Sequence, residues 1–243
     1  MVGMFYLIKG GGRKIMNLKE IPTIQFPSIK DYKIDELDEP LVNCKEMGFL
    51  CYSVYYNQGI AGSLKDIWVR ETVAKKLLNV EKNLPNGYKL KLWDGYRPLC
   101  VQRRLWNMYR SDILLKYKRE GKDLPNDELI DKETSFFVSK PSNDLLHPSL
   151  HNTGGAIDLT IVDKNGIELF MGTKFDDFGE KAWANHFETY EKNDIIRDNR
   201  RLLYNSMINE GFTNLPSEWW HYDYGDSKWA LLKNTKPIYN GII

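Results

Sequence analysis

The sequence predicts a single α+β domain in which helices flank a central sheet that is at least partly antiparallel. Its 243 residues suffice for one sizeable hydrophobic core with decorations. Segments with apolar residues at three- and four-residue steps predict helices, and segments of alternating apolar and polar residues predict strands. One such strand runs directly into Asn165-Gly166, a strong signal for a tight hairpin turn, which would place two strands antiparallel.

The composition favours a small partner. The 34 basic and 33 acidic residues leave a net charge of +1, which gives no global field to attract nucleic acid or an anionic membrane. The apolar stretch at residues 1–8 is too short to span a bilayer, and no signal peptide is recognisable. We therefore expect neither a nucleic-acid nor a membrane partner; the oligomeric state is left open.

The cysteines indicate a reducing compartment. Cys44, Cys51 and Cys100 are odd in number and show no C-x-x-C spacing, so neither a disulfide framework nor a thiolate metal site is indicated. Reduced thiols fit a cytoplasmic location.

The N-terminal segment, residues 1–16, is expected to be a flexible extension. Glycines at positions 10, 11 and 12 break the chain, and Met16 is an alternative start. The folded domain is then expected to span residues 17–243.

Residues 17–60 are expected to form strands and loops, because Pro22, Pro27 and Pro40 interrupt any long element. A polar aromatic cluster at 52–57, with Tyr55 at its centre, either lines a pocket or consists of ordinary core and surface tyrosines.

The next stretch predicts a helix, a strand and a second helix. Apolar periodicity predicts a helix over 63–80, and alternation predicts a strand over 89–93. The turn that follows places Arg97 on a loop, and the second helix begins near Pro98. Arg97 is either a structural ion pair with Asp94 or a planar clamp for a carboxylate or developing oxyanion.

Residues 119–146 are polar and charged and are interpreted as an excursion. Residues 156–162 then alternate, which places Ile157, Leu159 and Ile161 toward the core and aims Asp158 at a cleft on the other face.

The turn at 163–166 should return the chain as a second strand over 167–171. Asp176 and Asp177 follow on a loop near the same edge of the sheet. They bind a cationic group or form a solvated acidic turn.

A third helix is predicted over 194–210, ending at Gly211, and its arginines are expected to make structural ion pairs. Beyond it lie Glu218 and His221, which strict strand alternation would place on opposite faces. The conflict disappears if Glu218 lies in a turn and only 219–223 are extended.

Four residues supply the inventory of a catalytic zinc site. His151, Asp158 and His221 are nitrogen and oxygen donors, and tetrahedral zinc held by three protein groups keeps its fourth position for water. Glu218 is a spare carboxylate that can take the proton of that water. His147 competes as a ligand because it lies four residues before His151, but the following proline and the glycines at 154 and 155 argue against a continuous helix there. These glycines fit a loop whose backbone passes close to metal or substrate.

The motifs resemble a known family. Ser149-x-His151-x-x-Gly154-x-Ala156-x-Asp158, followed by Glu218-x-Trp220-His221, is similar to the pattern of the VanX-type D-alanyl-D-alanine dipeptidases, which are zinc metallopeptidases. The similarity runs from about residue 50 to 225. It also takes in four further motifs: Trp93-Asp-Gly-Tyr-Arg-Pro98, Met171-Gly-Thr-Lys-Phe-Asp176, Asn199-Arg-Arg201 and Glu218-Trp-Trp-His-Tyr222.

The resemblance implies an α+β fold with the site on an antiparallel sheet, and a small dipeptide substrate. It implies one Zn²⁺ per chain on His151, Asp158 and His221. It also implies that Glu218 is the catalytic base and that Arg97 stabilises the oxyanion. It further implies that Asp176 binds the substrate ammonium and that Ser149 lines the substrate pocket.

Two segments, 1–16 and 119–146, have no counterpart in the family pattern. Three alternatives remain: a zinc D,D-carboxypeptidase acting on peptidoglycan stem peptides, a non-catalytic zinc-dependent binding module, and a metal-free structural protein. Chain-length preference separates the dipeptidase from the carboxypeptidase, and retention of Glu218 and Arg97 argues against the binding module.

Overall fold

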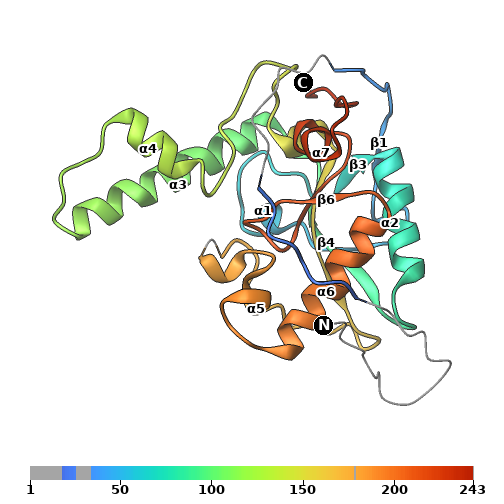
Figure 1. Ribbon diagram of the computed structural model, residues 1–243. Helices are drawn as coiled ribbons and strands as arrows, with labels where there is room; N and C mark the ends of the chain where they lie inside the picture. The colour runs from blue at the N-terminus through green and yellow to red at the C-terminus, as the bar shows by residue number, and fades with distance from the viewer. Residues whose placement is uncertain (1–17, 26–33, 178, 243) are drawn as a thin grey trace.

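A five-stranded sheet organises the computed structural model, which describes residues 18–25, 34–177 and 179–242 (Figure 1). Its strand order is β2-β4-β5-β7-β6, and every neighbouring pair is antiparallel except β2 and β4. The strands are Leu50–Cys51, Lys89–Asp94, Ala156–Val162, His221–Asp223 and Thr213–Asn214 in that order. The predicted α+β fold with a central antiparallel sheet is confirmed, with one parallel pair at the edge. The expected extension at 1–16 lies outside the described residues.

Strand β5 lies at the centre of this sheet and is buried along its whole length. Ile157, Leu159 and Ile161 have no exposed surface, as the alternation predicted. The turn after β5 also forms as expected, with the amide of Asp163 donating to the carbonyl of Ile167 over 2.8 Å.

The predicted return strand at 167–171 is wrong in extent. Only one bridge, between Val162 and Glu168, continues the pairing. The amide of Leu169 still donates to the carbonyl of Ile161 over 2.9 Å, and further along the carbonyl of Met171 accepts a hydrogen bond from Arg200 Nε over 2.8 Å.

Helices α2 (Glu71–Asn83) and α6 (Asp194–Asn209) pack against each other beside the sheet (Figure 1). Helix α6 matches its prediction: the Asn193 side chain caps its first turn, and Gly211 follows it with φ of 90°. Helix α2 begins later than expected because the preceding residues pair as a strand. That strand, β3 (Trp68–Arg70), joins β1 (Leu41–Asn43) in a small antiparallel sheet.

Helix α3 (Leu99–Arg119) begins next to Pro98, as predicted, and the excursion after it contains α4 (Asp127–Thr134). Helix α4 folds back on the distal half of α3, where Arg110 forms ion pairs with two aspartates of α4. Figure 1 shows both helices projecting from the sheet. We call α3, α4 and the residues that follow as far as Ser139 the arm.

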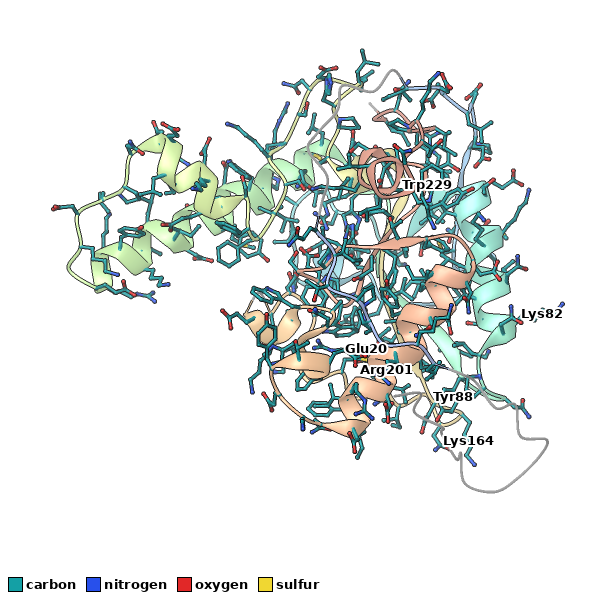
Figure 2. All side chains as sticks on the ribbon, in the orientation of Figure 1. Glu20, Lys82, Tyr88, Lys164, Arg201 and Trp229 are labelled. Carbon is teal, nitrogen blue, oxygen red and sulfur yellow. The ribbon has the colours of Figure 1, made fainter. Side chains whose placement is uncertain are left out.

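The remaining elements are short. Helix α1 (Val54–Asn57) is a helical turn within the tyrosine cluster, where strands and loops were expected. The others are η1 (Leu150–Thr153), η2 (Glu180–Ala182), α5 (His186–Thr189) and α7 (Ser227–Lys233). Trp229, labelled in Figure 2, ties α7 to the end of α6 by donating to the carbonyl of Gly211 over 2.9 Å.

The three cysteines are free thiols, as expected. Within the described part of the chain, no helix has both the length and the apolar character needed to cross a bilayer.

Candidate metal centre

Strand register brings the central acidic and imidazole side chains together. Asp158 on β5 lies directly opposite His221 on β7, and opposite Asp94 on β4. Residues opposite one another in antiparallel strands point to the same face, so these three side chains form one row across the sheet. An irregularity in β4 between Leu92 and Asp94 shifts the register and puts Asp94 into that row.

His151 reaches the row from η1, the short turn that enters β5. Gly154 ends that turn with φ of 74°, a left-handed conformation that favours glycine. A Cβ atom at Gly155 would lie 2.4 Å from the carbonyl oxygen of Tyr224. Gly155 therefore allows close packing against the chain after β7, and a Cβ atom at Gly154 would lie 2.6 Å from the Leu41 side chain.

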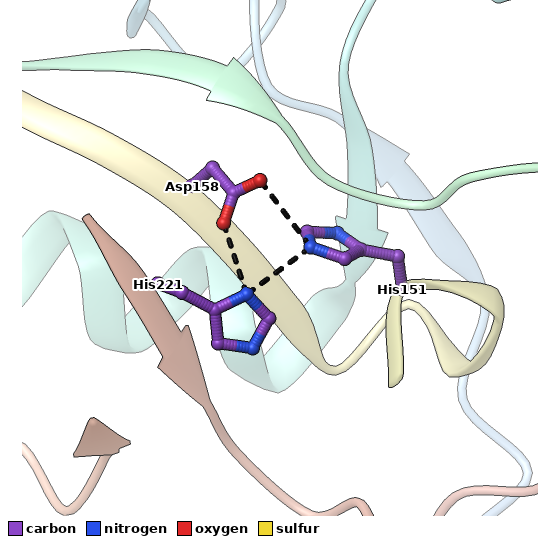
Figure 3. A group of neighbouring side chains, drawn as sticks. All are labelled: His151, Asp158 and His221. Carbon is purple, nitrogen blue, oxygen red and sulfur yellow. Dashed lines mark hydrogen bonds and ion pairs between the residues drawn. The ribbon is translucent and has the colours of Figure 1, made fainter. Parts of the chain in front are cut away.

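His151, Asp158 and His221 converge on one point (Figure 3). His151 Nε2 lies 3.3 Å from both Asp158 Oδ2 and His221 Nδ1, and His221 Nδ1 lies 3.0 Å from Asp158 Oδ1. These spacings could hold a metal ion. The competing ligand His147 is exposed and pairs with Asp144 over 2.7 Å, away from this cluster.

Outer hydrogen bonds fix how the two imidazoles face the centre. His151 Nδ1 donates to the carbonyl of Gly95 over 2.8 Å, and His221 Nε2 donates to Asp223 Oδ1 over 2.6 Å. With the outer nitrogen of each ring bonded in this way, the inner nitrogen is the one that faces the oxygens of Asp158 and can present a lone pair to a cation. Two such nitrogens beside a carboxylate form a donor set that fits a metal ion, which would take the place of any proton held there.

Burial and the neighbouring charges shift the pKa values of His221 and Asp158 in opposite directions, and the charges have the larger effect. Burial lowers the pKa of His221, but the carboxylates of Asp223 and Asp158 outweigh it and raise this pKa well above its ordinary value. Burial likewise raises the pKa of Asp158, but the two imidazoles hold it below its ordinary value. The cluster thus keeps a carboxylate in a buried place and favours positive charge beside it.

Glu218 lies in a turn before β7, which resolves the alternation conflict. The strand begins only at His221, two residues later than the expected extended segment. Glu218 Oε2 lies 3.8 Å from His221 Nδ1, on the same side as the metal-facing atoms. Burial, partly offset by His221, raises the pKa of Glu218 to about 7, which is suitable for a group that exchanges protons near neutral pH.

Arg97 makes the structural ion pair that was one of its two expected roles, and it also faces the metal cluster. Its Nε donates to Asp94 Oδ2 over 2.9 Å, which is the structural ion pair. Its Nη2 also lies 3.4 Å from the Tyr55 hydroxyl and 3.8 Å from Asp158 Oδ2. The guanidinium is therefore held rigidly with one edge facing the metal cluster.

Asp176 faces the same space from the opposite side, where it accepts a hydrogen bond from the Tyr55 hydroxyl over 3.2 Å. Burial and the nearby charge of Asp158 raise the pKa of Asp176 to about 8. Its φ of 59° is a left-handed conformation that Asp and Asn tolerate better than most residues. Asp177 is exposed, in keeping with a solvated turn.

A single cavity is lined by the metal cluster, Glu218, Arg97 and Asp176. Ser149 lines it, and the buried Ser149 hydroxyl has no hydrogen-bond partner among the described residues. All the residues that the sequence singled out for the site line this cavity: Arg97, Ser149, His151, Asp158, Asp176, Glu218 and His221.

Several residues of the cavity were not anticipated. Gln102, Tyr109 and Phe137 belong to the arm and line the cavity together with Tyr55. Tyr55 was noted only as part of a tyrosine cluster. Asp223 was not considered at all, although its position two residues after His221 on one strand face could have suggested it.

Comparison with known families decides the class of protein. A family model described as D-ala-D-ala dipeptidase, one of the M15 peptidases, matches residues 60–237, more than half of the chain. The chain belongs to this family. The resemblance seen in the motifs is therefore confirmed, and the protein is a peptidase by family.

Curated relatives in the D-ala-D-ala dipeptidase family agree. The D-alanyl-D-alanine dipeptidase of Synechocystis is 28% identical over 69% of this chain and 73% of its own length. The enzyme of that name from Enterococcus faecium is 34% identical over 62% of this chain and 69% of its own. The one from Enterococcus faecalis is 35% identical, and the chain covers 62% of its length.

Solved structures of similar proteins include a zinc(II) complex of a vancomycin-resistance D,D-pentapeptidase, VanY. It is 14% identical, with a TM-score of 0.42, over 71% of this chain and 83% of that one. An LD-carboxypeptidase, LdcB, is 18% identical with a TM-score of 0.39, over 83% of this chain and 76% of that one. Likeness at this level supports no statement about the substrate of this chain.

Proposed function

We propose that this protein is a zinc-dependent dipeptidase that hydrolyses free D-alanyl-D-alanine. The observation that carries the proposal is the convergence of His151, Asp158 and His221 in a cavity that Glu218, a half-buried glutamate, also lines. Membership of the D-ala-D-ala dipeptidase family supports the same substrate.

Zinc fits the cluster because two imidazoles and a carboxylate are among its usual donors and leave one tetrahedral position open. Bound there, zinc would supply a Lewis acid that polarises the peptide carbonyl and acidifies a water molecule. The protein positions the ligands through Gly95 and Asp223, which orient the two rings.

Glu218 is proposed as the general base. It takes a proton from the attacking water as the new C–O bond forms, and it returns that proton to the nitrogen as the peptide C–N bond breaks. A pKa of about 7 suits both transfers. Arg97, held by Asp94, stabilises the negative charge that develops on the carbonyl oxygen.

Asp176 is proposed to bind the free ammonium of the dipeptide. The half-buried carboxyl gains a cationic partner only when that amine is unblocked, so an N-acylated substrate forgoes this ion pair. Ser149, whose hydroxyl has no other partner among the described residues, is proposed to hydrogen-bond the substrate.

The test is amine release from free D-Ala-D-Ala and from an N-acylated tripeptide ending in D-Ala-D-Ala, using zinc-loaded protein. We expect hydrolysis of the free dipeptide alone. The Glu218→Gln variant should still bind zinc but lose at least roughly 100-fold in kcat, because general base catalysis is typically worth that much.

Two outcomes would contradict the proposal. Cleavage of the tripeptide alone would identify a D,D-carboxypeptidase and leave Asp176 without its proposed role. Unchanged turnover in Glu218→Gln would remove the proposed base, and inactivity of the zinc-loaded wild type on both peptides would favour a binding module.

A further inference from the structure

Two cavities of very different size meet beside Asp176. The catalytic cavity has a free volume of about 40 Å³. A wider groove of about 660 Å³ lies beyond it, between the arm and residues 174–177 with Gly179. Tyr109, Phe137 and Asp176 line both spaces, so these three side chains form the boundary between them.

The two aromatic residues on this boundary stack on each other. The ring centroids of Tyr109 and Phe137 are 5.8 Å apart and their planes are inclined by only 14°. Tyr109 comes from α3, whereas Phe137 comes from the segment after α4. The stack therefore closes the arm onto the end of the catalytic cavity that holds Asp176.

The arm holds this stack at a fixed place relative to the catalytic groups. Gln102 on α3 accepts a hydrogen bond from Arg97 Nη1 over 2.9 Å and donates to the carbonyl of Ser139 over 2.6 Å. Val138, between Phe137 and Ser139, is buried. One side chain thus connects the proposed oxyanion group to the segment that carries Phe137.

We propose that the Tyr109–Phe137 stack blocks the path from the catalytic cavity into the groove and thereby limits the substrate to two residues. This inference rests on the proposed dipeptidase function, because it assumes that the substrate amine lies at Asp176. An N-terminal extension would have to leave the cavity past this boundary. The stack acts as a specificity determinant that the arm contributes.

The Asp176 carboxyl alone does not exclude N-acylated peptides, so a steric barrier is needed to distinguish them from the free dipeptide. With no ammonium partner, a pKa of about 8 leaves this carboxyl largely protonated at neutral pH. In a complex with an N-acylated peptide, the protonated carboxyl can donate a hydrogen bond to the carbonyl oxygen of the acyl group, and no unpaired charge is buried. N-acylated peptides are then rejected because the rings of Tyr109 and Phe137 occupy the volume that the acyl group would need.

The experiment removes one ring and compares the substrates. Phe137→Ala should raise the ratio of kcat/KM for the N-acylated tripeptide to kcat/KM for free D-Ala-D-Ala at least tenfold. Phe136→Ala is the matched control, because Phe136 is the adjacent residue, is 69% exposed and does not line either cavity. Its ratio should stay at the wild-type value. Tyr109→Leu, which removes the other ring, should act in the same direction as Phe137→Ala.

A binding measurement separates this inference from the proposed function. In a zinc-loaded Glu218→Gln background, calorimetric binding of the tripeptide should tighten at least tenfold on Phe137→Ala and not on Phe136→Ala. If wild type cleaves no D-Ala-D-Ala but this tightening occurs, the dipeptidase proposal fails and the barrier stands. The proposed barrier is wrong if Phe137→Ala and Tyr109→Leu both fold but change neither the ratio of the two kcat/KM values nor the affinity for the tripeptide.

Discussion

At the scale of single residues, the raised pKa of Asp176 lowers the stability of the fold at neutral pH. Its pKa is raised to about 8 because burial and a neighbouring carboxylate disfavour its charge. The folded protein therefore holds a proton that the unfolded chain releases near pH 4. The free energy of unfolding must fall as the pH rises through that interval, and the loss is complete above pH 8.

Replacing Asp176 with Asn is expected to stabilise the fold and abolish dipeptide turnover. Asn tolerates the left-handed backbone and can still accept the Tyr55 hydrogen bond. Urea unfolding of metal-free protein should show an advantage of the variant that is small near pH 5 and reaches the order of 1–3 kcal/mol at pH 8. An advantage that does not grow with pH would rule out the raised pKa.

Asp223 is expected to control metal affinity without touching the metal. Its carboxylate accepts the outer proton of His221 over 2.6 Å and so fixes which nitrogen faces the centre. Asp223→Asn should weaken zinc binding by roughly 10–100-fold, the usual effect of losing such a partner. Competition with a chromophoric chelator measures this. Asp144→Asn, at the exposed partner of His147, is the control and should bind zinc like the wild type.

At the scale of elements, helix α6 positions the loop that carries Asp176. Arg200 on this helix donates to three backbone carbonyls, those of Met171, Lys181 and Trp183, at 2.6–2.8 Å. Its guanidinium also lies 4.7 Å from the centre of the Phe187 ring. One buried side chain thereby holds both ends of the loop that contains Asp176.

Arg200→Lys is expected to lower both stability and dipeptide affinity. Lysine keeps the charge but cannot reach three carbonyls in the planar arrangement of a guanidinium. We expect a loss of roughly 2–4 kcal/mol in the free energy of unfolding, since hydrogen bonds to charged groups contribute about 1.5–3 kcal/mol each. KM for D-Ala-D-Ala should rise. Arg197→Lys on the same helix keeps a cation beside Asp194 and Asp198, away from this loop, and should change neither the free energy of unfolding nor KM.

The sequence predicted those elements whose signals are local. The alternation around Asp158 and the glycine after α6 were sufficient to place β5 and the end of α6. The helix expected from residue 63 was wrong because Trp68–Arg70 pairs with β1, a contact that apolar periodicity does not show. The cluster of His151, Asp158 and His221 was predictable from residue type and spacing. Gln102 and Phe137 were not, because only the folding of the arm brings them to the cavity.

At the scale of the whole molecule, the metal centre joins parts that are distant in the chain. His151, Asp158 and His221 come from η1, β5 and β7, and Glu218 comes from the turn before β7. A ligand that binds only the folded state stabilises it, by about 4 kcal/mol when its free concentration is 1,000 times its Kd. Zinc should therefore stabilise the entire sheet.

Removing zinc with a chelator is expected to lower the Tm by roughly 10 °C, given about 2–4 °C per kcal/mol for a chain of this size. Two acid-to-amide variants separate ligand from base in the same melting experiment. Glu218→Gln should keep the zinc-dependent shift, whereas Asp158→Asn should lose most of it. Equal shifts in both would contradict the ligand assignment.

The part of the arm that lines the cavity tolerates less change than the turn between α3 and α4. Gln102, Tyr109 and Phe137 line the cavity, so a change at any of them alters its shape. The turn between α3 and α4 lies far from the sheet in Figure 1, and residues 121–124 are exposed. Mutations can therefore accumulate at the tip without reaching the chemistry, and a foreign epitope spliced between Lys122 and Asp123 should leave catalysis intact. The arm thus offers a place to attach labels or surfaces to this peptidase without redesigning it.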